Sequence, residues 1–480
     1  MMRRRTKKAI ALYETRIAPS YIIKTVISWF FATILFFVTC AILPFAADIN
    51  IGAETAKTVS FENLTATRTE SERPDSEKER VQFIPTSEAA FIKRLNFVAS
   101  ARHTIDFSVF DNYDDLWTRH FYAALLDAAD RGVRVRIVVD GKMGKLDGNN
   151  VELGKILQNH NNIEFYYFNP LNIANPSAIM VNLHDKITIA DGKRMIVGGV
   201  NMGRGAYLSN YDAEVMVTNS GENGSVGQAM RYFESLLGSG NVKLKRTKYK
   251  NDGAKSGYIA RYKAFINSHD EAKTDISEPG IAADKVTFLS NRPTLVKKEP
   301  VIMQALYNLA ENSSKTLIVT PYALLEDGKI AHWRSIAAAS DEFTIVTNSL
   351  YNSRNVAYSV YHGWRSDYIC DDIALWEYQA VDQLHAKMYL FDDRYTVIGS
   401  FNFDERSAHI DTESVVLIDS YEFNALVREY INNTFLANSL RVGANNKYIP
   451  SDTVKAGAVP PKKSALYTLM RCLKTVMCLL

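Results

Sequence analysis

The segments HDKITIAD at residues 184–191 and HAKMYLFD at residues 385–392 share the pattern His-x-Lys-x-x-x-x-Asp. Each segment is followed by a short turn, an apolar run and a small-residue corner that ends in an asparagine, Asn201 or Asn402. Two matches in the same sequence context are hard to ascribe to chance, although a motif alone remains a hypothesis. The chain is therefore expected to contain a duplicated unit.

The elements predicted around the two segments follow the same order. In the first copy we expect helices over 88–101 and 117–130, and strands over 104–110, 133–140, 163–168, 182–190, 194–200 and 213–218. In the second copy we expect helices over 300–312 and about 328–340, and strands over 316–322, 343–347, 373–378, 384–391, 395–399 and 412–418. The strands mix alternation with continuous apolar stretches, as expected where helices cover most of a sheet. The predicted fold is α/β, with two similar domains of mixed sheet flanked by helices, packed pseudo-symmetrically.

The histidine and lysine of each segment are two residues apart, so their side chains would point to one face of a strand. Two facing copies would surround one anion with two imidazoles and two ammonium groups, as in-line displacement at a phosphodiester requires. One imidazole would attack phosphorus and become phosphorylated. The other would protonate the departing alkoxide and then deprotonate the incoming alcohol or water. The candidate catalytic residues are His184, Lys186, His385 and Lys387, with Asn201 and Asn402 holding phosphate oxygens and no metal or cofactor required.

The aspartates that end the two segments, Asp191 and Asp392, have the opposite strand parity and fall at a turn. They are counted among the candidate catalytic residues because they could orient an imidazole, as the carboxylate of a triad does. The alternative is a role in forming the turn. Four further acids at like positions could orient the imidazoles or neutralise the lysines, or could be exposed and solvated: Asp212, Glu214, Asp411 and Glu413.

The formal net charge of +3 is unevenly distributed along the 480 residues. A basic leader over residues 1–24 holds seven Lys or Arg and one Glu, so it carries +6 and the rest of the chain carries −3. A body of this charge lacks the basicity of a dedicated nucleic-acid-binding protein. The four cysteines have no metal-ligand or redox spacing, which argues against a disulfide framework and a structural zinc site.

Residues 25–47 contain no charged side chain and are rich in Phe, Ile, Val and Leu. This segment is long enough to cross a bilayer as a helix. A cleaved signal peptide is the alternative, but Pro44 or Phe45 stands where a small residue should precede the cleavage site. Because the basic leader comes first, the sequence predicts a cytoplasmic N-terminus and a catalytic body on the opposite side of the cell membrane.

The rest of the chain divides by composition. We expect a polar tether over 48–82, a first folded domain over 83–245, a linker over 246–283, a second domain over 284–445 and a tail over 446–480. The basic run at 243–250 could bind anionic lipid headgroups or form an ordinary solvated linker. Apolar residues at helical spacing in 464–480 could form an amphipathic helix that lies on a membrane or packs on the body.

The two segments resemble the paired HKD motifs of the phospholipase D superfamily. The sequences GSFNFDERS at 399–407 and VGGVNMG at 197–203 look like its bacterial cardiolipin synthase branch, and AADRGVRV at 128–135 is similar to a stretch in such enzymes. The resemblance implies two phospholipase D-type domains, and transfer of a phosphatidyl group from one phosphatidylglycerol to another with release of glycerol. It also implies that His184 is the nucleophile and His385 the acid and base. Relatives usually carry an acid at the position of Arg204, so this rim could bind a different headgroup.

The leading interpretation is a membrane-anchored phosphatidyltransferase whose partners are a phospholipid and the membrane. Phospholipid hydrolysis would differ only in whether water or a lipid hydroxyl reaches the phosphohistidine. A metal-independent nuclease of the same superfamily would use identical chemistry, but the body lacks an extended basic stripe, so nucleic acid is not an expected partner. A non-catalytic membrane scaffold is a third hypothesis, and the two intact motifs argue against it.

Overall fold

The computed structural model describes residues 49–172, 174–203, 210–268, 280–354 and 357–470, together with Phe31, Thr39 and Phe45. The predicted leader, almost all of the predicted span over 25–47, Arg204 and the last ten residues of the predicted amphipathic helix lie outside these residues. Within the described ranges, no helix combines the length and the apolar character that crossing a bilayer requires.

The described part of the first half is built on a mixed sheet with the strand order β10-β1-β8-β6-β5-β2-β3-β4-β9. Its strands are β1 (Arg80–Ile84), β2 (Thr104–Val109), β3 (Arg134–Asp140), β4 (Ile163–Phe168), β5 (Ile187–Ala190), β6 (Arg194–Gly198), β8 (Glu214–Thr218), β9 (Val242–Lys245) and β10 (Ile281–Ala282). Its helices are α6 (Ser87–Ala99), α7 (Leu116–Asp130), α8 (Val151–Asn159), α10 (Ser225–Gly238) and α11 (Asp252–Ser268), with 3₁₀ turns η2 (Gly148–Asn150) and η3 (Pro176–Met180).

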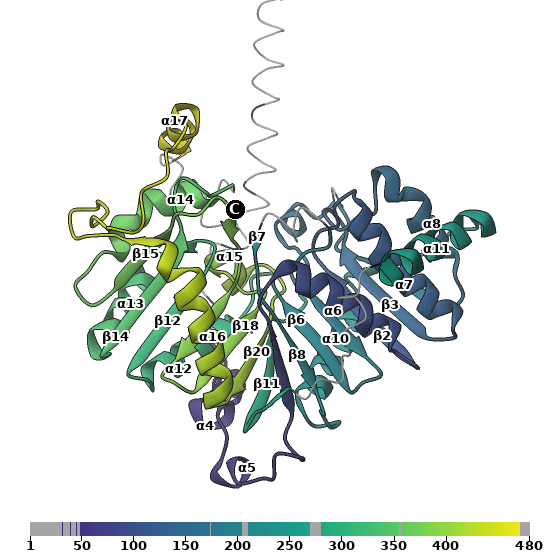
Figure 1. Cartoon of the computed structure of the whole chain (residues 1–480), viewed down its shortest axis with the longest axis horizontal. Helices are drawn as coiled ribbons and strands as arrows, with labels where there is room; N and C mark the ends of the chain where they lie inside the picture. The colour runs from purple at the N-terminus through teal and green to yellow at the C-terminus, as the bar shows by residue number, and fades with distance from the viewer. Residues whose placement is uncertain are drawn as a thin grey trace, which may run out of the picture.

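The second half repeats this plan with the strand order β11-β20-β18-β17-β12-β14-β15-β21 (Figure 1). Its strands are β11 (Lys285–Ser290), β12 (Lys315–Val319), β14 (Glu342–Asn348), β15 (Ala374–Tyr378), β17 (Met388–Phe391), β18 (Tyr395–Gly399), β20 (Ser414–Asp419) and β21 (Ser439–Arg441). Its helices are α12 (Val301–Glu311), α13 (Asp327–Ala339), α14 (Ala357–Trp364), α15 (Glu405–His409), α16 (Tyr421–Thr434) and α17 (Pro461–Met470), with 3₁₀ turns η5 (Arg365–Tyr368) and η6 (Leu436–Asn438). The prediction of an α/β fold with two similar domains is confirmed.

A central core joins the two sheets. Ile187 and Ile189 of β5 and Met388 and Leu390 of β17 are buried in this one apolar cluster. The alternate residues of β17, such as Tyr389, face a second core beneath the helices of their own half. Because both faces of each central strand are covered, these strands are apolar at nearly every position.

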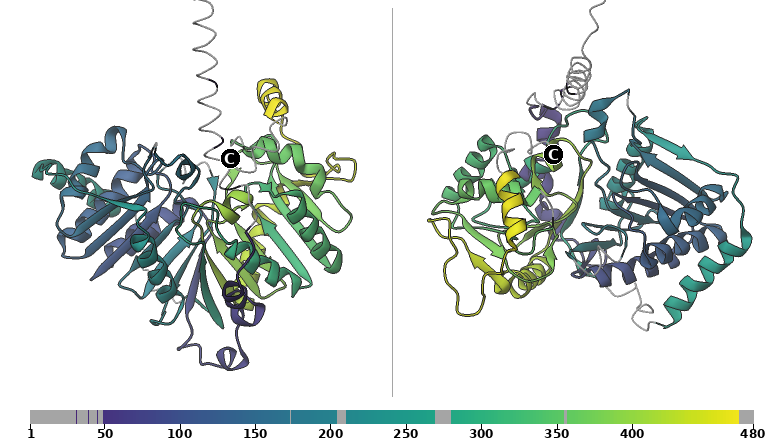
Figure 2. Two further views of the ribbon diagram at one scale, coloured as in Figure 1. Left: turned by 180° about the vertical axis from the view of Figure 1, so that it is seen from behind. Right: turned by 90° about the horizontal axis from the view of Figure 1, so that it is seen from above.

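Helices also bridge the two halves. The backbone N–H of Phe288 in β11 donates to the side chain of Gln228 in α10, 2.7 Å away. In the opposite direction, the Tyr430 hydroxyl of α16 donates to the carbonyl of Pro85, 2.6 Å away, next to β1. Each half thus contributes one helix that contacts the outer part of the other sheet, at β11 or beside β1. Figure 2 shows the two halves side by side in two further views.

The strands predicted over 182–190 and 384–391 are shorter than expected, because β5 begins at Ile187 and β17 at Met388. The residues before them leave their own sheet and pair with the other half. Leu183 forms a parallel bridge with Thr412, and β16 (Gln383–Leu384) pairs with β7 (Asn210–Tyr211). This reciprocal pairing, which the sequence pattern did not predict, carries each motif histidine into contact with the opposite half.

The predicted tether over 48–82 is not a free polar segment in its described part. Residues 53–71 form three short helices, α3 (Ala53–Thr58), α4 (Phe61–Leu64) and α5 (Arg68–Ser71), and residues 80–84 form β1. The few apolar side chains of the segment are used for docking, since Val59 and Leu64 are buried in the core of the second half beside α12. The chain therefore enters the body as a segment held on the second half, with α4 and α5 at its lower end in Figure 1.

The predicted linker over 246–283 also contains structure that its polar composition did not suggest. Helix α11 packs along α7, where the His120 ring stacks on Phe265 with centroids 4.7 Å apart. The Lys263 ammonium lies 2.7 Å from the Asp127 carboxylate of α7. The basic run at 243–250 begins in β9, an edge strand paired with β4. The domain boundaries themselves stay predictions.

Candidate active site

Both histidines lie at one edge of the paired sheets, which we call the site edge. Strands β2, β3, β12 and β14 end there, and β5 and β17 begin there. Buried polar side chains at the ends of β3 and β14 hold the residue before each histidine. The Leu183 N–H donates to Asp140 and the Leu384 N–H to Asn348, each over 2.9 Å. The motif spacing did not point to Asp140 or Asn348 as site residues. The signal for them in the sequence is a polar residue at the end of an apolar strand.

Each imidazole is paired with a carboxylate from the opposite half. The Nδ1 atom of His184 lies 2.9 Å from Glu413 Oε1, and Nδ1 of His385 lies 2.6 Å from Asp212 Oδ2. A carboxylate at Nδ1 fixes the ring orientation and leaves Nε2 for chemistry. The carboxylates are buried, whereas 12% of the His184 side chain and 22% of the His385 side chain remain exposed. The geometry thus provides two oriented imidazoles that solvent can reach.

The two lysines stand beside the histidines of their own motifs. The Lys186 ammonium donates to the His184 carbonyl over 2.6 Å and lies 5.4 Å from the centroid of the Phe110 ring. The Lys387 ammonium lies 3.0 and 3.1 Å from the two ring nitrogens of His385. Both lysines are fully buried, and burial lowers the pKa of Lys186 to about 7 and that of Lys387 to about 8. An anion placed here would stabilise both ammonium groups.

The four motif side chains influence each other electrostatically across the two halves. Burial, followed by Lys186, lowers the pKa of His184 well below its usual value, and Lys387 and His385 of the other half add to this effect. Burial and Lys387 lower the pKa of His385, which Asp212 partly offsets, while Lys186 lowers it further. The two motifs therefore belong to one site, in which His184 is the imidazole whose protonation is opposed most strongly.

The two carboxylates differ in charge. Burial raises the pKa of Glu413 to about 8 although Lys186 opposes the change. Burial alone would also raise the pKa of Asp212, but Lys387 and His385 outweigh it and hold this pKa below its usual value. At neutral pH the His385 partner is thus ionised, whereas the His184 partner is largely protonated.

Two serines hold Glu413 in place. Ser407 Oγ donates to Oε1 over 2.7 Å, and Ser400 Oγ contacts Oε2. Both serines lie in the segment GSFNFDERS at 399–407, whose pattern alone indicated no role for them. Ser400, at the corner after β18, and Ser407, in α15, thus fix Glu413, and Glu413 in turn orients His184.

The two corner asparagines also reach the site edge. Asn201 follows β6 and Asn402 follows β18, at equivalent points of the two halves. The side-chain oxygen of each is buried and has no hydrogen-bond partner among the described residues. Each oxygen could accept a hydrogen bond from a ligand hydroxyl, whereas a phosphate oxygen would need the amide N–H groups, and Asn402 Nδ2 already donates to the Tyr322 hydroxyl over 3.3 Å. The phosphate-holding role of the two asparagines therefore stays a prediction.

The motif aspartates are not brought to the histidines, which corrects their assignment as orienting carboxylates. Asp191 and Asp392 follow β5 and β17 at the opposite edge of the sheets, both with positive φ. The Asp191 carboxylate accepts the backbone N–H groups of Arg102, His103 and Thr104. The Asp392 carboxylate accepts those of Ser314 and Lys315 over 2.8 and 3.0 Å. The geometry supports the turn-forming alternative.

Two of the four additional acids are used elsewhere. Glu214 pairs with Arg94 inside the first half, where both side chains are fully buried. Asp411 accepts from Arg406 Nε over 2.8 Å and, across the halves, from the Asn182 N–H over 2.8 Å. Asp411 therefore orients the backbone leading to His184, and only Asp212 and Glu413 contact an imidazole.

Replacing Asp191 by asparagine should destabilise the fold without impairing the chemistry. Burial alone would raise the pKa of Asp191, but its backbone hydrogen bonds outweigh this and lower it. The carboxylate therefore stabilises the fold above the unfolded-state pKa, and this contribution is lost as pH falls through the lower folded-state pKa. We expect a loss of about 1–2 kcal/mol at pH 7 in urea unfolding. That loss should shrink in acid.

An exposed acid at the equivalent turn of the second half provides the control, since Asp393→Asn removes the same charge without removing a backbone clamp. Activity of Asp191→Asn should stay within about twofold of the parent, because no reacting group touches this residue. A large fall in turnover at unchanged stability would return Asp191 to the list of catalytic residues.

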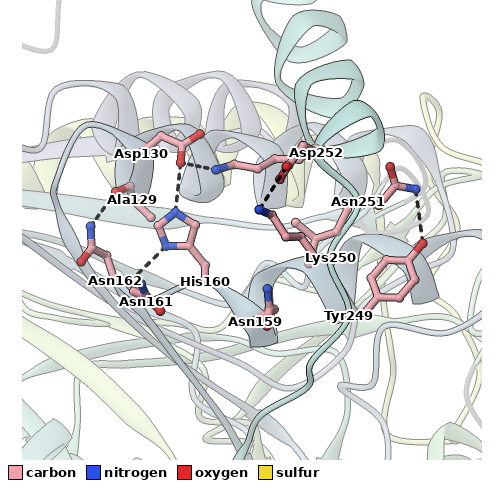
Figure 3. A pocket seen from close by; sticks show the side chains of 12 residues that line it. Ala129, Asp130, Asn159, His160, Asn161, Asn162, Tyr249, Lys250, Asn251 and Asp252 are labelled. Atoms are coloured by element: carbon pink, nitrogen blue, oxygen red, sulfur yellow. Dashed lines mark hydrogen bonds and ion pairs between the residues drawn. The ribbon is translucent and has the colours of Figure 1, made fainter.

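A separate hollow of about 450 Å³ lies among α7, α8 and the start of α11 (Figure 3). Its titratable groups are paired with one another: Asp130 contacts the His160 ring, 3.0 Å away, and the Lys255 ammonium. Lys250 lies 3.3 Å from Asp252. These pairs satisfy each other's charge, so the constellation with reactive groups is the one at the site edge.

Comparison with known proteins agrees with the fold. The family model for the PLD-like domain of cardiolipin synthase matches residues 95–237 and 301–435. Cardiolipin synthase C of Escherichia coli (strain K12) is 26% identical over 395 residues, covering 70% of this chain and 81% of that protein. An uncharacterised protein of Helicobacter pylori (strain ATCC 700392 / 26695) is 26% identical over 383 residues, covering 71% and 76%. The crystal structure of phosphatidylserine synthase from Haemophilus influenzae Rd KW20 has the same fold, with a TM-score of 0.61 at 14% identity, over 88% of this chain and 100% of that one.

Proposed function

Because the chain belongs to the phospholipase D superfamily, with both halves matched by its cardiolipin synthase domain, we propose that it joins two phosphatidylglycerols through a phosphohistidine intermediate. The observation that carries the proposal is the pair of crossed contacts, His184 with Glu413 and His385 with Asp212. They hold two imidazoles beside two buried ammonium groups in one site. The similarity to a protein named cardiolipin synthase C supports a phosphatidyl acceptor.

In the first step, Nε2 of His184 attacks the phosphorus of one phosphatidylglycerol and the bond to its headgroup glycerol breaks. Neutral His184 is suited to this attack, because burial and Lys186 oppose its protonation. His385, which carries a proton as an imidazolium when the anionic phosphodiester is bound, gives this proton to the departing glycerol alkoxide. The ionised Asp212 favours the protonated form of this ring, so His385 is the better of the two rings at carrying the proton to be donated.

In the second step, His385 takes the proton from a headgroup hydroxyl of a second phosphatidylglycerol, whose oxygen attacks the phosphohistidine. The bond from phosphorus to His184 breaks, and cardiolipin leaves. Lys186, Lys387, Asn201 and Asn402 would hold the non-bridging oxygens, whose charge must be stabilised in both transition states. Water in place of the second lipid would give phosphatidic acid, so exclusion of water distinguishes transfer from hydrolysis.

We also propose that residues 25–47 anchor the protein in the cell membrane, with the body on the side opposite the basic leader. The sequence supports this, since 23 uncharged residues follow a leader of charge +6. The attachment point is compatible with it. The N–H of Gly52, a few residues beyond the predicted span, donates to Glu299 over 2.9 Å, and Glu299 lies in the connection after β11 at the site edge.

The proposal is tested by incubating the purified full-length protein with labelled phosphatidylglycerol in EDTA and resolving the lipid products. Cardiolipin with one glycerol released per product is the expected result. Phosphatidic acid as the main product would instead identify the protein as a phospholipase D that hydrolyses the lipid. Cleavage of DNA without any lipid product would overturn it in favour of a nuclease.

The lysines predict a pH dependence. Their pKa values are lowered to about 7 and about 8 in the free protein, so the ammonium form is lost as pH rises through this range. We therefore expect kcat/KM, which reports the free enzyme, to begin to fall above about pH 7 and to fall more steeply above about pH 8. A bound phosphate raises both pKa values, so the fall in kcat should occur at higher pH. A kcat/KM that stays flat through about pH 9 would contradict the role given to the lysines.

A further inference from the structure

Several connections at the site edge end in exposed apolar side chains. Met143 follows β3, Leu171 follows β4 and Ile179 lies in η3, just before His184. In the second half, Val296 follows β11 and Val381 follows β15. We call these five residues the apolar rim. Between 45% and 68% of each is exposed, which is unusual for aliphatic side chains of this size.

Residues next to three of the rim positions contact other segments at the site edge. The Lys142 ammonium, next to Met143, donates to the carbonyl of Ile179 over 3.2 Å. Asn169, two residues before Leu171, donates to the carbonyl of Val181 over 2.7 Å. The Lys298 N–H, close to Val296, donates to the His409 carbonyl over 2.8 Å. These contacts hold the connections that carry Met143, Leu171, Ile179 and Val296 beside the site.

The opposite edge of the sheets is different. Among the described residues, its connections expose only Tyr421 and Ile449 as large apolar side chains, and the Arg394 guanidinium lies over one face of the Tyr421 ring, 5.3 Å from its centroid. Exposed apolar side chains scattered singly need no explanation, but a set confined to the edge that holds the reactive groups marks an interaction surface. The rim is thus associated with the site and not with the fold in general.

The chain also enters the body at the site edge. Gly52 and Thr55 contact the Glu299 carboxylate over 2.9 and 2.7 Å, and Glu299 is three residues from the rim residue Val296. The uncharged run over 25–47 ends five residues before Gly52. A bilayer that holds this run would therefore lie near the site edge and not near the opposite edge.

We infer that the apolar rim inserts into the surface of a phospholipid bilayer and seats the site directly on the lipid layer. The inference rests on the proposed function, because only a lipid substrate requires the reacting groups to meet the bilayer. Exposed cationic side chains accompany the rim at Lys145 and Arg292, but the acid Asp147 lies in the same edge. Apolar contact is therefore the main source of binding, and anionic headgroups add less.

The first test measures insertion directly and needs no turnover. Full-length Leu171→Trp and Val381→Trp are reconstituted into phosphatidylglycerol vesicles with and without brominated acyl chains. We expect the fluorescence added by each new tryptophan to shift to the blue and to be quenched at least about twofold by bromine. Tyr421→Trp, at the opposite edge, is the matched control and should show neither effect. Equal quenching at both edges, or none at the rim, would overturn the inference.

The second test separates the rim from the chemistry. Leu171→Asp and Val381→Asp should lower kcat/KM on phosphatidylglycerol vesicles at least about tenfold, because a charge is costly within the acyl boundary. On monomeric short-chain phosphatidylglycerol they should match the parent, as should Tyr421→Asp on both substrates. Unchanged turnover on vesicles, or an equal loss on both substrates, would overturn the inference while leaving the proposed function in place. If the parent turned over neither substrate, the proposed function would fail, and the tryptophan measurement would still decide the rim.

Discussion

Replacement of His385 by glutamine should reduce turnover of phosphatidylglycerol roughly 10⁴-fold or more, while still allowing a single attack on an activated substrate. A glycerol alkoxide is a poor leaving group and needs the proton that His385 supplies. p-Nitrophenolate needs none, so phosphatidyl-p-nitrophenol should release about one equivalent per enzyme and then stop, because no base remains to activate the acceptor. Stopped-flow absorbance measures this burst, and the stalled enzyme should carry label from a labelled lipid.

The matched variant is His184→Gln, which removes the proposed nucleophile and should give no burst with either substrate. Both rings lie against a carboxylate of the other half, so the two substitutions disturb similar surroundings. A burst in His184→Gln and none in His385→Gln would reverse the two roles. Continued turnover in either variant would contradict a covalent intermediate shared between the halves.

The two orienting carboxylates should differ sharply in their importance. Asp212→Asn should lower kcat roughly 10³- to 10⁴-fold, because it removes the ionised partner that fixes the His385 tautomer and supports its protonated form. Glu413→Gln should cost only about tenfold, since burial already raises the Glu413 pKa to about 8 and a neutral amide resembles the protonated acid. Steady-state kinetics at pH 7, with thermal unfolding as a check on folding, measures both effects.

A substrate with an activated leaving group distinguishes a catalytic role of Asp212 from a purely structural one. Asp212→Asn should show a burst of p-nitrophenolate with phosphatidyl-p-nitrophenol, since this substitution impairs His385 and leaves His184 intact. Equal losses in the two variants would contradict the charge difference assigned to the carboxylates. A loss in Asp212→Asn that follows its thermal stability would reduce Asp212 to a folding role.

The local part of the site was predictable from sequence because it depends on short spacing. The two His-x-Lys pairs, the strands that follow them and the corners at Asn201 and Asn402 all follow from period-two patterning and the duplication. The helical predictions over 88–101 and 117–130 agree with α6 and α7 to within two residues. The short spacing also suggested long strands through the histidines, which is wrong because pairing with the other half ends them early.

The choice of orienting carboxylate could not be predicted from spacing. Asp212 and Asp411 occupy equivalent positions, as do Glu214 and Glu413, so the duplication favours neither. Two arginines break the symmetry, since Arg94, 120 residues away in the chain, pairs with Glu214, and Arg406, five residues away, pairs with Asp411. What remains for the imidazoles is one aspartate and one glutamate, and this outcome needs the whole fold.

Docking of the segment over 48–82 was missed for a related reason. Its average composition is polar, but two apolar residues, Val59 and Leu64, fit into an existing core. Composition averages over such residues, whereas packing depends on each of them. The same applies to the polar stretch that forms α11.

The reciprocal pairing of residues 182–184 with 411–412 and of 383–386 with 210–211 makes the two reaction centres a single cooperative assembly. Neither half owns a complete acid–imidazole couple, so a cut at the junction between them would yield two inert fragments that regain function only when they recombine. Separation of the two halves would remove the orienting carboxylate from His184 and from His385 at the same time. An ancestral protein with one copy of the unit would have needed a second copy of itself to supply the carboxylate that orients its imidazole.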